Sequence, residues 1–323
     1  MFVKDRKVPL PLLALDALIA RLIPGHPKLG DMRQQAARYQ KGYNGERKLD
    51  YHLRSLPERF AVLNDVGLTI FGKQFQIDSL IVTSHAIYIL EVKSFEGTVT
   101  FDTGLKQFIQ ANGEKLHGRK YPITQVENIQ FHFLRWLQMR GLAGLPFYYY
   151  VLFAEPSTII KVVGDEGAVR KVVFYVDEAP LRLMKADKWL TEGRSGNNQL
   201  KNRVVRTVME GYEDFQKDML REFDVDAQDI LPGVACSACG TLGMVRLRYR
   251  WRCGKCGAFS RDAHLDALCD WALLFGKEIT NRQCRDFLGV GRSAAHSLLS
   301  GAGLSFQKGK RVWLLDIDKL GRR

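Results

Sequence analysis

The sequence has no uninterrupted apolar run of the roughly eighteen residues that predict a membrane-spanning helix, so we expect neither a membrane span nor a membrane partner. It also has no clear export signal. Lys4, Arg6 and Lys7 precede the apolar stretch 8–20, as in a signal peptide, but Asp16 interrupts that stretch and no pattern of small residues marks a cleavage site. We therefore expect an amphipathic N-terminal helix in a cytoplasmic protein.

Acidic residues are under-represented. The chain has 35 Asp and Glu against 48 Lys and Arg, which gives a formal net charge of +13. Such an excess favours polyanionic partners, although charge alone does not separate nucleic acid from an anionic membrane surface. The 323 residues, 46% of them hydrophobic, are enough for two or three folded domains. The sequence contains no internal repeat and no low-complexity tract.

Cysteine is scarce, but four of the six cysteines form two C-x-x-C-G pairs with a hairpin-length insert between them: Cys236, Cys239, Cys253 and Cys256. This spacing is the ligand pattern of a four-thiolate zinc ribbon, whereas a redox pair needs only one C-x-x-C. Disulfides are not expected in a chain without an export signal. We therefore predict a structural Zn²⁺ site. The remaining Cys269 and Cys284 lie among apolar residues and are predicted to be buried thiols.

Two runs rich in β-branched and aromatic residues predict a hairpin with a short turn, at 76–82 and 87–93. If Val82 pairs with Ile87, the register places Asp78 opposite Glu91, and Lys93 projects beside Glu91. Carboxylates facing each other at about 5 Å between their Cβ atoms repel, so a hard cation such as Mg²⁺ explains them better than a structural role. Lys93 would orient a water or offset phosphate charge. An ordinary hairpin with solvent-facing charges is the alternative.

Two polar residues accompany this hairpin. A helix is predicted to open at 42–46, and Glu46 falls on its apolar stripe, where a helix-terminal charge or a structural ion pair is the alternative to a site role. A second helix is predicted over 125–140, and Gln125 in its first turn would serve either as a cap or as a site residue.

Together these residues resemble the nuclease-related domain, NERD, of the PD-(D/E)xK nuclease superfamily. The segments that carry the resemblance, between Arg38 and Ala154, are Gly45-Glu46, 62–66, Gln76-Ile77-Asp78, 88–93, Gly97 and Pro122-x-x-Gln125. The resemblance implies an α/β (α+β) restriction-endonuclease-like core with a mixed sheet. In that core Asp78 and Glu91 would bind Mg²⁺ or Mn²⁺, Lys93 would assist the attacking water, and Glu46 and Gln125 would complete the site. Ile77 stands where the superfamily motif has proline.

Between the cysteine pairs, arginines alternate with apolar residues: Arg246, Arg248, Arg250 and Arg252. In a strand they would share one face, and the segment 234–260 contains no acidic residue to neutralise them. We predict positioning contacts with phosphate, with a solvated basic face as the alternative. Trp251, on the other face, is predicted to lie in the core of the ribbon.

The C-terminal stretch predicts three helices, a tight glycine turn and a hairpin, which resembles a winged helix-turn-helix. The residues expected to contact nucleic acid are Arg292, Ser293, His296, Lys308, Lys310 and Arg311. A trihelical packing module without a nucleic-acid role is the alternative.

The predicted organisation is an N-terminal helical segment at 1–37, a nuclease-like domain at 38–228, a zinc ribbon at 234–260 and a winged-helix-like domain at 263–321. The predicted function is that of a Mg²⁺-dependent DNA endonuclease, with RNA not excluded as substrate and a homodimer as the simplest way to cut both strands. From the family resemblance alone, a bacterial role in defence or DNA processing is expected. The alternative is a non-catalytic DNA-binding protein whose nuclease-like domain is a scaffold or sensor.

Overall fold

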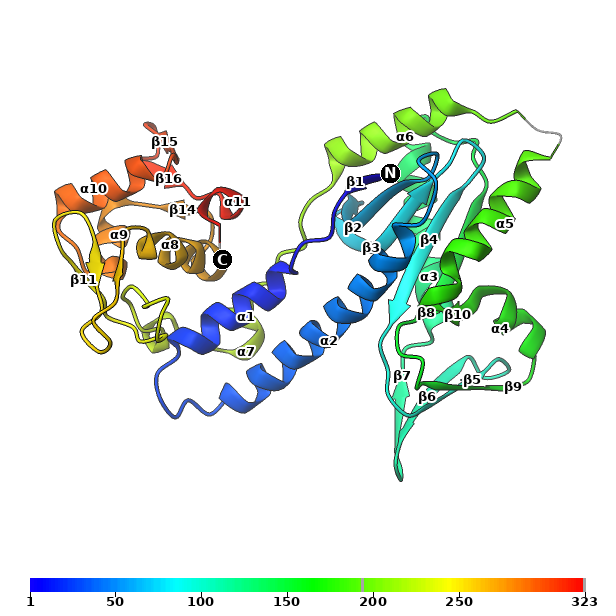
Figure 1. Cartoon of the computed structure of the whole chain (residues 1–323), viewed down its shortest axis with the longest axis horizontal. Helices are drawn as coiled ribbons and strands as arrows, with labels where there is room; N and C mark the ends of the chain where they lie inside the picture. Colours follow the sequence, from blue (N-terminus) through cyan, green and yellow to red (C-terminus); the bar gives the residue numbers. More distant parts are fainter. Residues whose placement is uncertain (193–194, 322–323) are drawn as a thin grey trace. The chain divides into compact units, whose positions relative to one another are not determined.

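The computed structural model describes residues 1–192 and 195–321, and the chain divides into two compact units (Figure 1). Unit 1 comprises Met1–Pro9 and Arg38–Phe215, and unit 2 comprises Leu10–Ala37 and Gln216–Arg323. The predicted N-terminal segment is therefore divided between the two units. Among the described residues, no helix combines the length and the apolar character needed to cross a membrane.

The centre of unit 1 is a six-stranded sheet. Its strands, in spatial order, are β1 (Phe2–Lys4), β2 (Ala61–Ile70), β3 (Lys73–Val82), β4 (Ile87–Lys93), β8 (Phe147–Phe153) and β10 (Val173–Tyr175). The pairs β2–β3 and β3–β4 are antiparallel, whereas β1–β2, β4–β8 and β8–β10 are parallel. The mixed sheet is thus confirmed. The continuous apolar run of β4 suits a central strand whose two faces are both covered.

Helices pack on both faces of this sheet. One face packs against α3 (Pro122–Gln138) and α6 (Asn198–Gly211). The other packs against the C-terminal part of α2 (Leu29–Leu53) and against α5 (Ala179–Thr191). Helix α3 buries side chains at helical spacing: Val126, Ile129, Phe133, Trp136 and Leu137. The prediction that the helix carrying Glu46 opens at 42–46 was wrong, because α2 begins at Leu29 and continues through this segment.

A second, four-stranded sheet of unit 1 was not predicted. Its strands, in spatial order, are β7 (Lys115–Arg119), β6 (Gln107–Asn112), β5 (Thr98–Asp102) and β9 (Ile159–Val163). Figure 1 shows β6 and β7 extending as a narrow hairpin away from the larger sheet. A short helix, α4 (Glu166–Val172), and the 3-10 turn η1 (Val176–Glu178) flank β10. The strands of this sheet are only five or six residues long, which explains why their pattern gave little signal.

Unit 2 begins with α1 (Leu10–Arg21), α7 (Met219–Phe223) and the turn η2 (Ala227–Asp229). A three-stranded ribbon follows, made of β11 (Val245–Arg246), β12 (Trp251–Arg252) and β13 (Phe259–Ser260). Trp251 is fully buried, as predicted, and its indole N–H points to Nδ1 of His264 at 3.4 Å.

The remainder of unit 2 has the element order of a winged helix-turn-helix. These elements are α8 (Ala263–Phe275), β14 (Glu278–Ile279), α9 (Asn281–Leu288), α10 (Arg292–Gly301), β15 (Ser305–Gln307), β16 (Val312–Leu314) and α11 (Ile317–Leu320). A capping box between Thr280 and Gln283 starts α9. Gly289 ends it at φ +67, a left-handed conformation that costs glycine little. Strand β16 pairs with both β14 and β15, so the predicted hairpin is part of a small three-stranded sheet.

Helix α1 packs against α8 within unit 2 through a buried ion pair. Nε of Arg21 lies 2.7 Å from Oδ2 of Asp270, and the two side chains are 1% and 8% exposed. Arg21 also donates hydrogen bonds to the carbonyl oxygens of Leu231 and Gly233. Cys269 and Cys284 are fully buried in the same unit, as predicted.

Candidate functional site: carboxylates of the large sheet and a four-cysteine cluster

Strands β3 and β4 pair in the predicted register, with Val82 opposite Ile87. The regular pairing ends one residue before Asp78 and Glu91 would face each other. Oδ2 of Asp78 instead accepts a hydrogen bond from the backbone N–H of Val92 at 3.0 Å. This bond fixes the carboxylate of Asp78 against β4, beside the strand position that carries Glu91.

Glu91, Lys93 and Gln125 form one hydrogen-bonded group. The ammonium of Lys93 donates to Oε1 of Glu91 at 2.7 Å and to Oε1 of Gln125 at 2.9 Å. Nε2 of Gln125 donates to the same Oε1 of Glu91 at 2.7 Å. Because the N-cap position of α3 is Tyr121 and Gln125 bonds to Glu91, the alternative role of Gln125 as a helix cap is wrong.

Glu46 reaches the same region from α2. It lies in the body of that helix, far from the N-terminus at Leu29, so a helix-terminal charge does not explain it. Its Oε2 accepts a hydrogen bond from Nη1 of Arg6 at 2.7 Å, which shows that an ion pair is present. Glu46 also experiences the charges of Asp78 and Glu91, and therefore lies near both.

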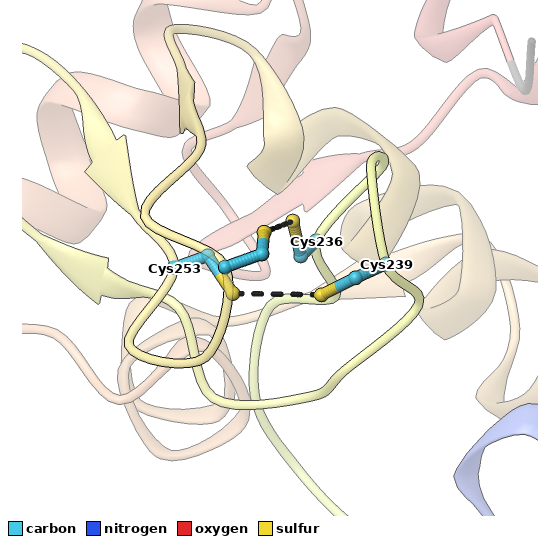
Figure 2. Close-up of side chains that lie close together, drawn as sticks. Cys236, Cys239 and Cys253 are labelled. Atoms are coloured by element: carbon cyan, nitrogen blue, oxygen red, sulfur yellow. Dashed lines mark hydrogen bonds between the residues drawn. The ribbon is translucent and has the colours of Figure 1, made fainter.

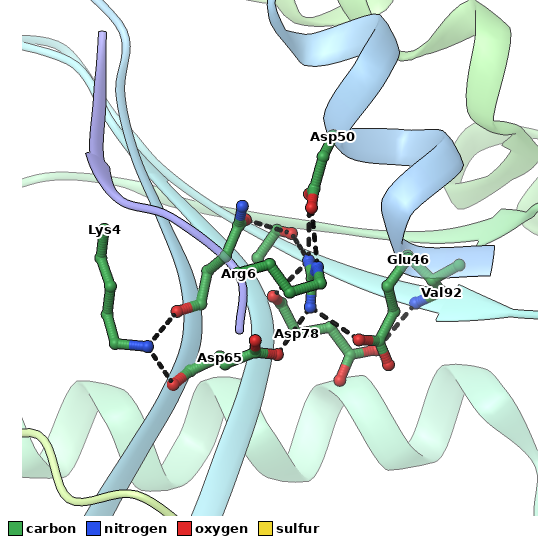
Figure 3. Close-up of polar contacts among 9 residues, drawn as sticks. Lys4, Arg6, Glu46, Asp50, Asp65, Asp78 and Val92 are labelled. Carbon is green, nitrogen blue, oxygen red and sulfur yellow. Dashed lines mark hydrogen bonds and ion pairs between the residues drawn. The ribbon is translucent and has the colours of Figure 1, made fainter. Parts of the chain in front are cut away.

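Arg6 is the central residue of this cluster and was not predicted from the sequence (Figure 3). Its side chain is only 2% exposed. Besides Glu46, the guanidinium contacts Oδ1 of Asp65 at 2.6 Å, Oδ2 of Asp50 at 2.8 Å, the carbonyl oxygen of Asp78 at 2.9 Å and Oγ of Ser79 at 2.8 Å. A single buried arginine thus joins α2, β2 and β3 at the carboxylates.

The residues around Arg6 gave only weak sequence signals. Arg6 belongs to a short basic cluster that resembles the start of a signal peptide, and Asp65 lies in one of the segments that carry the family resemblance. Lys4 donates to the carbonyl oxygens of Asn64 and Asp65 at 2.8 and 3.0 Å. Asp65 has φ +51, a conformation that aspartate adopts more readily than most residues. These contacts are long-range, so no local pattern reveals them.

The carboxyl groups at this site are buried close to one another, and the nearby cations do not offset the resulting rise of their pKa values. Burial, followed by the charge of Asp78, raises the pKa of Glu46 to about 9, although Arg6 acts in the opposite direction. Burial and Asp78 likewise raise the pKa of Glu91 to about 7 against the opposing effect of Lys93. Burial also raises the pKa of Asp65 to about 6. A site with this balance favours an additional cation.

A divalent metal also fits the donor atoms that are present. Asp78 uses Oδ2 for the Val92 amide, and Glu91 uses Oε1 for Lys93 and Gln125. In the part of the chain that the structure describes, the second oxygen of each carboxylate accepts no hydrogen bond. Mg²⁺ commonly takes one or two protein carboxylates and fills its remaining positions with water and substrate phosphate.

Gly45 allows α2 to approach the end of β4 this closely. A Cβ atom at this position would lie 3.0 Å from the Cβ atoms of both Ala154 and Ser94. A larger residue would therefore push the helix away from the sheet and move Glu46 with it. The pairing of Gly45 with Glu46 in the sequence has this geometric reason.

A pocket of about 760 Å³ borders other residues of α2, but none of the predicted catalytic side chains lines it. Its α2 residues are Asn44, Arg47, Lys48, Tyr51 and His52. At 3.6 residues per turn these residues lie on faces of the helix other than that of Glu46.

The four ribbon cysteines form a separate candidate metal site in unit 2 (Figure 2). Their sulfur atoms all lie within 4.8 Å of one another, with Cys236 and Cys256 at 3.7 Å and Cys239 and Cys253 at 3.6 Å. A tetrahedral Zn²⁺ with bonds of about 2.3 Å separates its sulfur ligands by about 3.8 Å, so the cluster has the right size for such an ion. No other group of three or more His, Cys, Asp or Glu ligand atoms in the described residues is this compact.

The two cysteine turns have the same backbone geometry. The N–H of Gly240 bonds to the carbonyl of Cys236, and that of Gly257 bonds to the carbonyl of Cys253. Both glycines have positive φ, at +70 and +75. The glycine that follows each cysteine pair in the sequence has this structural reason, because both turns require a left-handed residue.

The predicted strand of four arginines was wrong. The chain turns between β11 and β12, where the N–H of Leu247 bonds to the carbonyl of Arg250 at 2.8 Å. Arg246 pairs with Trp251, and Arg252 pairs with Val245, so these two arginines lie on opposite faces of the ribbon. The alternation of faces expected for a single strand is interrupted, because Val245 belongs to the first strand of a hairpin and Trp251 to the second. The arginines therefore do not form one continuous basic row.

In the winged-helix-like part of unit 2, called the winged unit below, the residues predicted to contact nucleic acid are exposed. Arg292, Ser293 and His296 lie on the solvent side of α10. Lys308, Lys310 and Arg311 occupy the turn between β15 and β16, although Lys310 also forms an ion pair with Glu278 at 2.8 Å. All six predicted side chains are therefore accessible to solvent, on α10 and on the turn between β15 and β16.

Comparison with known proteins assigns the central part of unit 1. Residues 41–154 match the family model of the nuclease-related domain, NERD. No curated protein and no solved structure matched the chain. The matched range contains Glu46, Asp78, Glu91, Lys93 and Gln125, whereas Arg6 and the four-cysteine cluster lie outside it. Residues 41–154 of this chain therefore form a nuclease-related domain of the NERD family.

Proposed function

We propose that the protein is a metal-dependent nuclease that cleaves phosphodiester bonds of DNA. The observation that carries this proposal is the convergence of Asp78, Glu91 and Lys93 in a nuclease-related domain, with one oxygen of each carboxylate available. Oxygen ligands of this kind suit Mg²⁺ or Mn²⁺. When bound, such an ion polarises a phosphoryl oxygen and lowers the pKa of a coordinated water.

The protein side chains would then have distinct roles. Asp78 and Glu91 hold the cation with their available oxygens. Lys93, fixed between Glu91 and Gln125, presents its ammonium toward the substrate phosphate or the attacking water. Gln125 orients Lys93 and Glu91 together, since it accepts from one and donates to the other. Glu46 adds a third carboxyl group to the site from α2, close to Asp78 and Glu91.

Unit 2 supplies two candidate DNA-binding elements. We propose Zn²⁺ as the ion of the four-cysteine cluster, with a structural role, because all four ligands come from the protein and leave no open position. The exposed arginines of the ribbon and the wing of the winged unit would contact phosphates and hold the substrate. The net charge of +13 supports a polyanionic partner.

The experiment that tests this proposal is cleavage of supercoiled plasmid by the purified full chain in Mg²⁺ or Mn²⁺. Asp78→Ala and Lys93→Ala should each reduce the rate by at least about 100-fold, the usual size of such a loss. Matched controls are Asp177→Ala and Lys161→Ala, which change exposed residues away from the site. Folding and DNA affinity are measured for every variant.

Each outcome has a clear meaning. Cleavage by the wild type and the controls, but by neither site variant, supports the nuclease and its site. Tight DNA binding without cleavage would favour the alternative of a non-catalytic protein with a nuclease-related scaffold. Equal cleavage by all five proteins would mean that Asp78 and Lys93 do not form the active site. The ratio of nicked to linear product, together with the mass in solution, tests whether a homodimer cuts both strands.

A further inference from the structure

The hairpin of β6 and β7 carries an exposed group of cations that the proposed site does not use. We define the basic arm as Lys106, which precedes β6, together with Lys115, Arg119 and Lys120 at β7. All four side chains are exposed. Within the described part of the chain, none of the four forms an ion pair with a carboxylate. Glu114, at the tip of the hairpin, is the acidic residue of this segment.

The strand register determines where these side chains point. Arg119 pairs with Phe108, and Phe108 pairs with Phe101, so the three side chains lie on one face of the small sheet. Phe101 and Phe108 are buried on this face. Arg119 confirms the direction by donating two hydrogen bonds to Oε1 of Gln110, a buried residue of the same face. Lys115, four residues before Arg119, lies on that face too.

This face leads directly to the candidate site. Phe101 packs edge to face against Tyr121, with ring centroids 5.7 Å apart, and Tyr121 is the N-cap residue of α3. Gln125 follows one helical turn later and bonds to Lys93. Lys106 lies over the ring of Tyr121 at 5.7 Å. The basic arm therefore begins beside the helix end that carries Gln125 and extends outward along β7.

The dimensions of the arm fit a nucleic-acid backbone. At about 3.3 Å per residue, the distance from Arg119 to Lys115 is about 13 Å. One strand of a duplex advances about 3.4 Å per phosphate along the helix axis, so the arm has the length of about four phosphates. Unpaired lysines and arginines on an exposed strand are suited to non-specific phosphate contacts.

We propose that the basic arm binds the backbone of the DNA strand next to the scissile phosphate. This inference rests on the proposed nuclease function, because it places the same substrate on the domain. A simpler use of charge on β7 would be protection of a sheet edge from pairing with another chain. Charge reversal separates the two, since glutamate also protects an edge but repels phosphate.

The test uses full-length protein carrying Asp78→Ala, so that binding is measured without cleavage. Lys115→Glu and Arg119→Glu are introduced together, and the matched control is Lys185→Glu with Lys188→Glu, two exposed residues of α5. Affinity for a fluorescent 20-base-pair duplex is measured over a range of salt concentrations, with thermal unfolding as the folding check. The arm variant should bind at least tenfold more weakly than the control. Its salt dependence should correspond to about two fewer released counterions.

Equal affinity and equal salt dependence of the two variants would overturn the proposal. A normal affinity accompanied by a change in mass on size-exclusion chromatography would also overturn it, and would assign the arm to pairing between copies. The wild-type plasmid assay is read separately. Failure of that assay would refute the nuclease, whereas unchanged DNA affinity of the arm variant would refute only the role of the arm.

Discussion

Nη1 of Arg6 lies 2.7 Å from Oε2 of Glu46 and 2.6 Å from Oδ1 of Asp65. This contact joins the first nine residues of the chain to carboxylates of the nuclease-related domain, although the family match begins only at residue 41. The three carboxylates around it raise the pKa of Arg6 despite its burial, so it remains charged. Arg6 thus positions acidic side chains that would otherwise repel each other.

Replacement of Arg6 is expected to damage both stability and activity. Arg6→Ala leaves buried carboxylates without a partner, and removing one member of a buried ion pair typically costs about 3–5 kcal/mol. Arg6→Lys keeps the charge but cannot bridge several acceptors at once, so it should recover part of the loss. Thermal unfolding and plasmid cleavage are compared with those of Arg47→Ala, an exposed control on α2. Wild-type behaviour of Arg6→Ala would refute the positioning role.

The raised pKa of Glu46 predicts how stability depends on pH. The unfolded side chain releases its proton near its ordinary pKa of 4.5, whereas the folded one retains it up to about 9. Between these values the folded state binds more protons, so the stability of the metal-free protein should fall as pH rises from about 4.5 to about 9. Glu46→Gln removes this titration and should flatten the curve.

At pH 8, Glu46→Gln should therefore unfold at a higher temperature than the wild type in EDTA, while plasmid cleavage decreases. Glu96→Gln is the control, because the carboxylate of Glu96 is exposed and lies at the surface. Unfolding temperatures are measured from pH 5 to pH 9. A wild-type curve that rises with pH, or a Glu46→Gln curve parallel to it, would contradict the prediction.

Much of the site was accessible to sequence reasoning because it depends on short-range patterns. The pairing of Val82 with Ile87 follows from two adjacent strand-like runs and a short turn, and it places Asp78 near Glu91. The position of Gln125 in the first turn of α3 follows from the local helix pattern. The cysteine turns follow from spacing and glycine alone. In each case the residues that decide the geometry are neighbours in sequence.

The predictions that were wrong, and the residues that were missed, involve contacts between residues far apart in the sequence that override a local pattern. Arginines that alternate with apolar residues from 245 to 252 fit a single strand, but closing a ribbon around the cysteines requires a turn in that segment. Glycines at 42 and 45 suggested a helix start, yet packing of Gly45 against Ala154 explains one of them within a continuous helix. Arg6 contacts partners that lie 40 or more residues away in the sequence, which no periodicity can indicate.

Removal of metal from the four-cysteine cluster should unfold the ribbon locally. We expect one Zn²⁺ per chain by elemental analysis, lost when Cys236→Ser and Cys256→Ser are combined. Because thiolate ligation contributes directly to the folding of small zinc sites, Trp251 should become exposed and its fluorescence should shift. Cys269→Ala is the control, since this cysteine is buried outside the cluster. Retention of a full equivalent of zinc by the double variant would show that these cysteines do not bind it.

The buried pair of Arg21 and Asp270 should be a major source of stability in unit 2. Arg21→Met or Asp270→Asn leaves the other charged group buried without its ion-pair partner. Each change is expected to lower the free energy of unfolding by about 3–5 kcal/mol. Arg21 also bonds to the carbonyls of Leu231 and Gly233, so its loss should be the larger. The double change should cost clearly less than the sum of the single ones, because no uncompensated charge remains. Hydrogen exchange of α1 and α8 measures this effect locally, and Arg292→Met, a change of an exposed residue of α10, is the control. Strictly additive effects would show that the two side chains do not depend on each other.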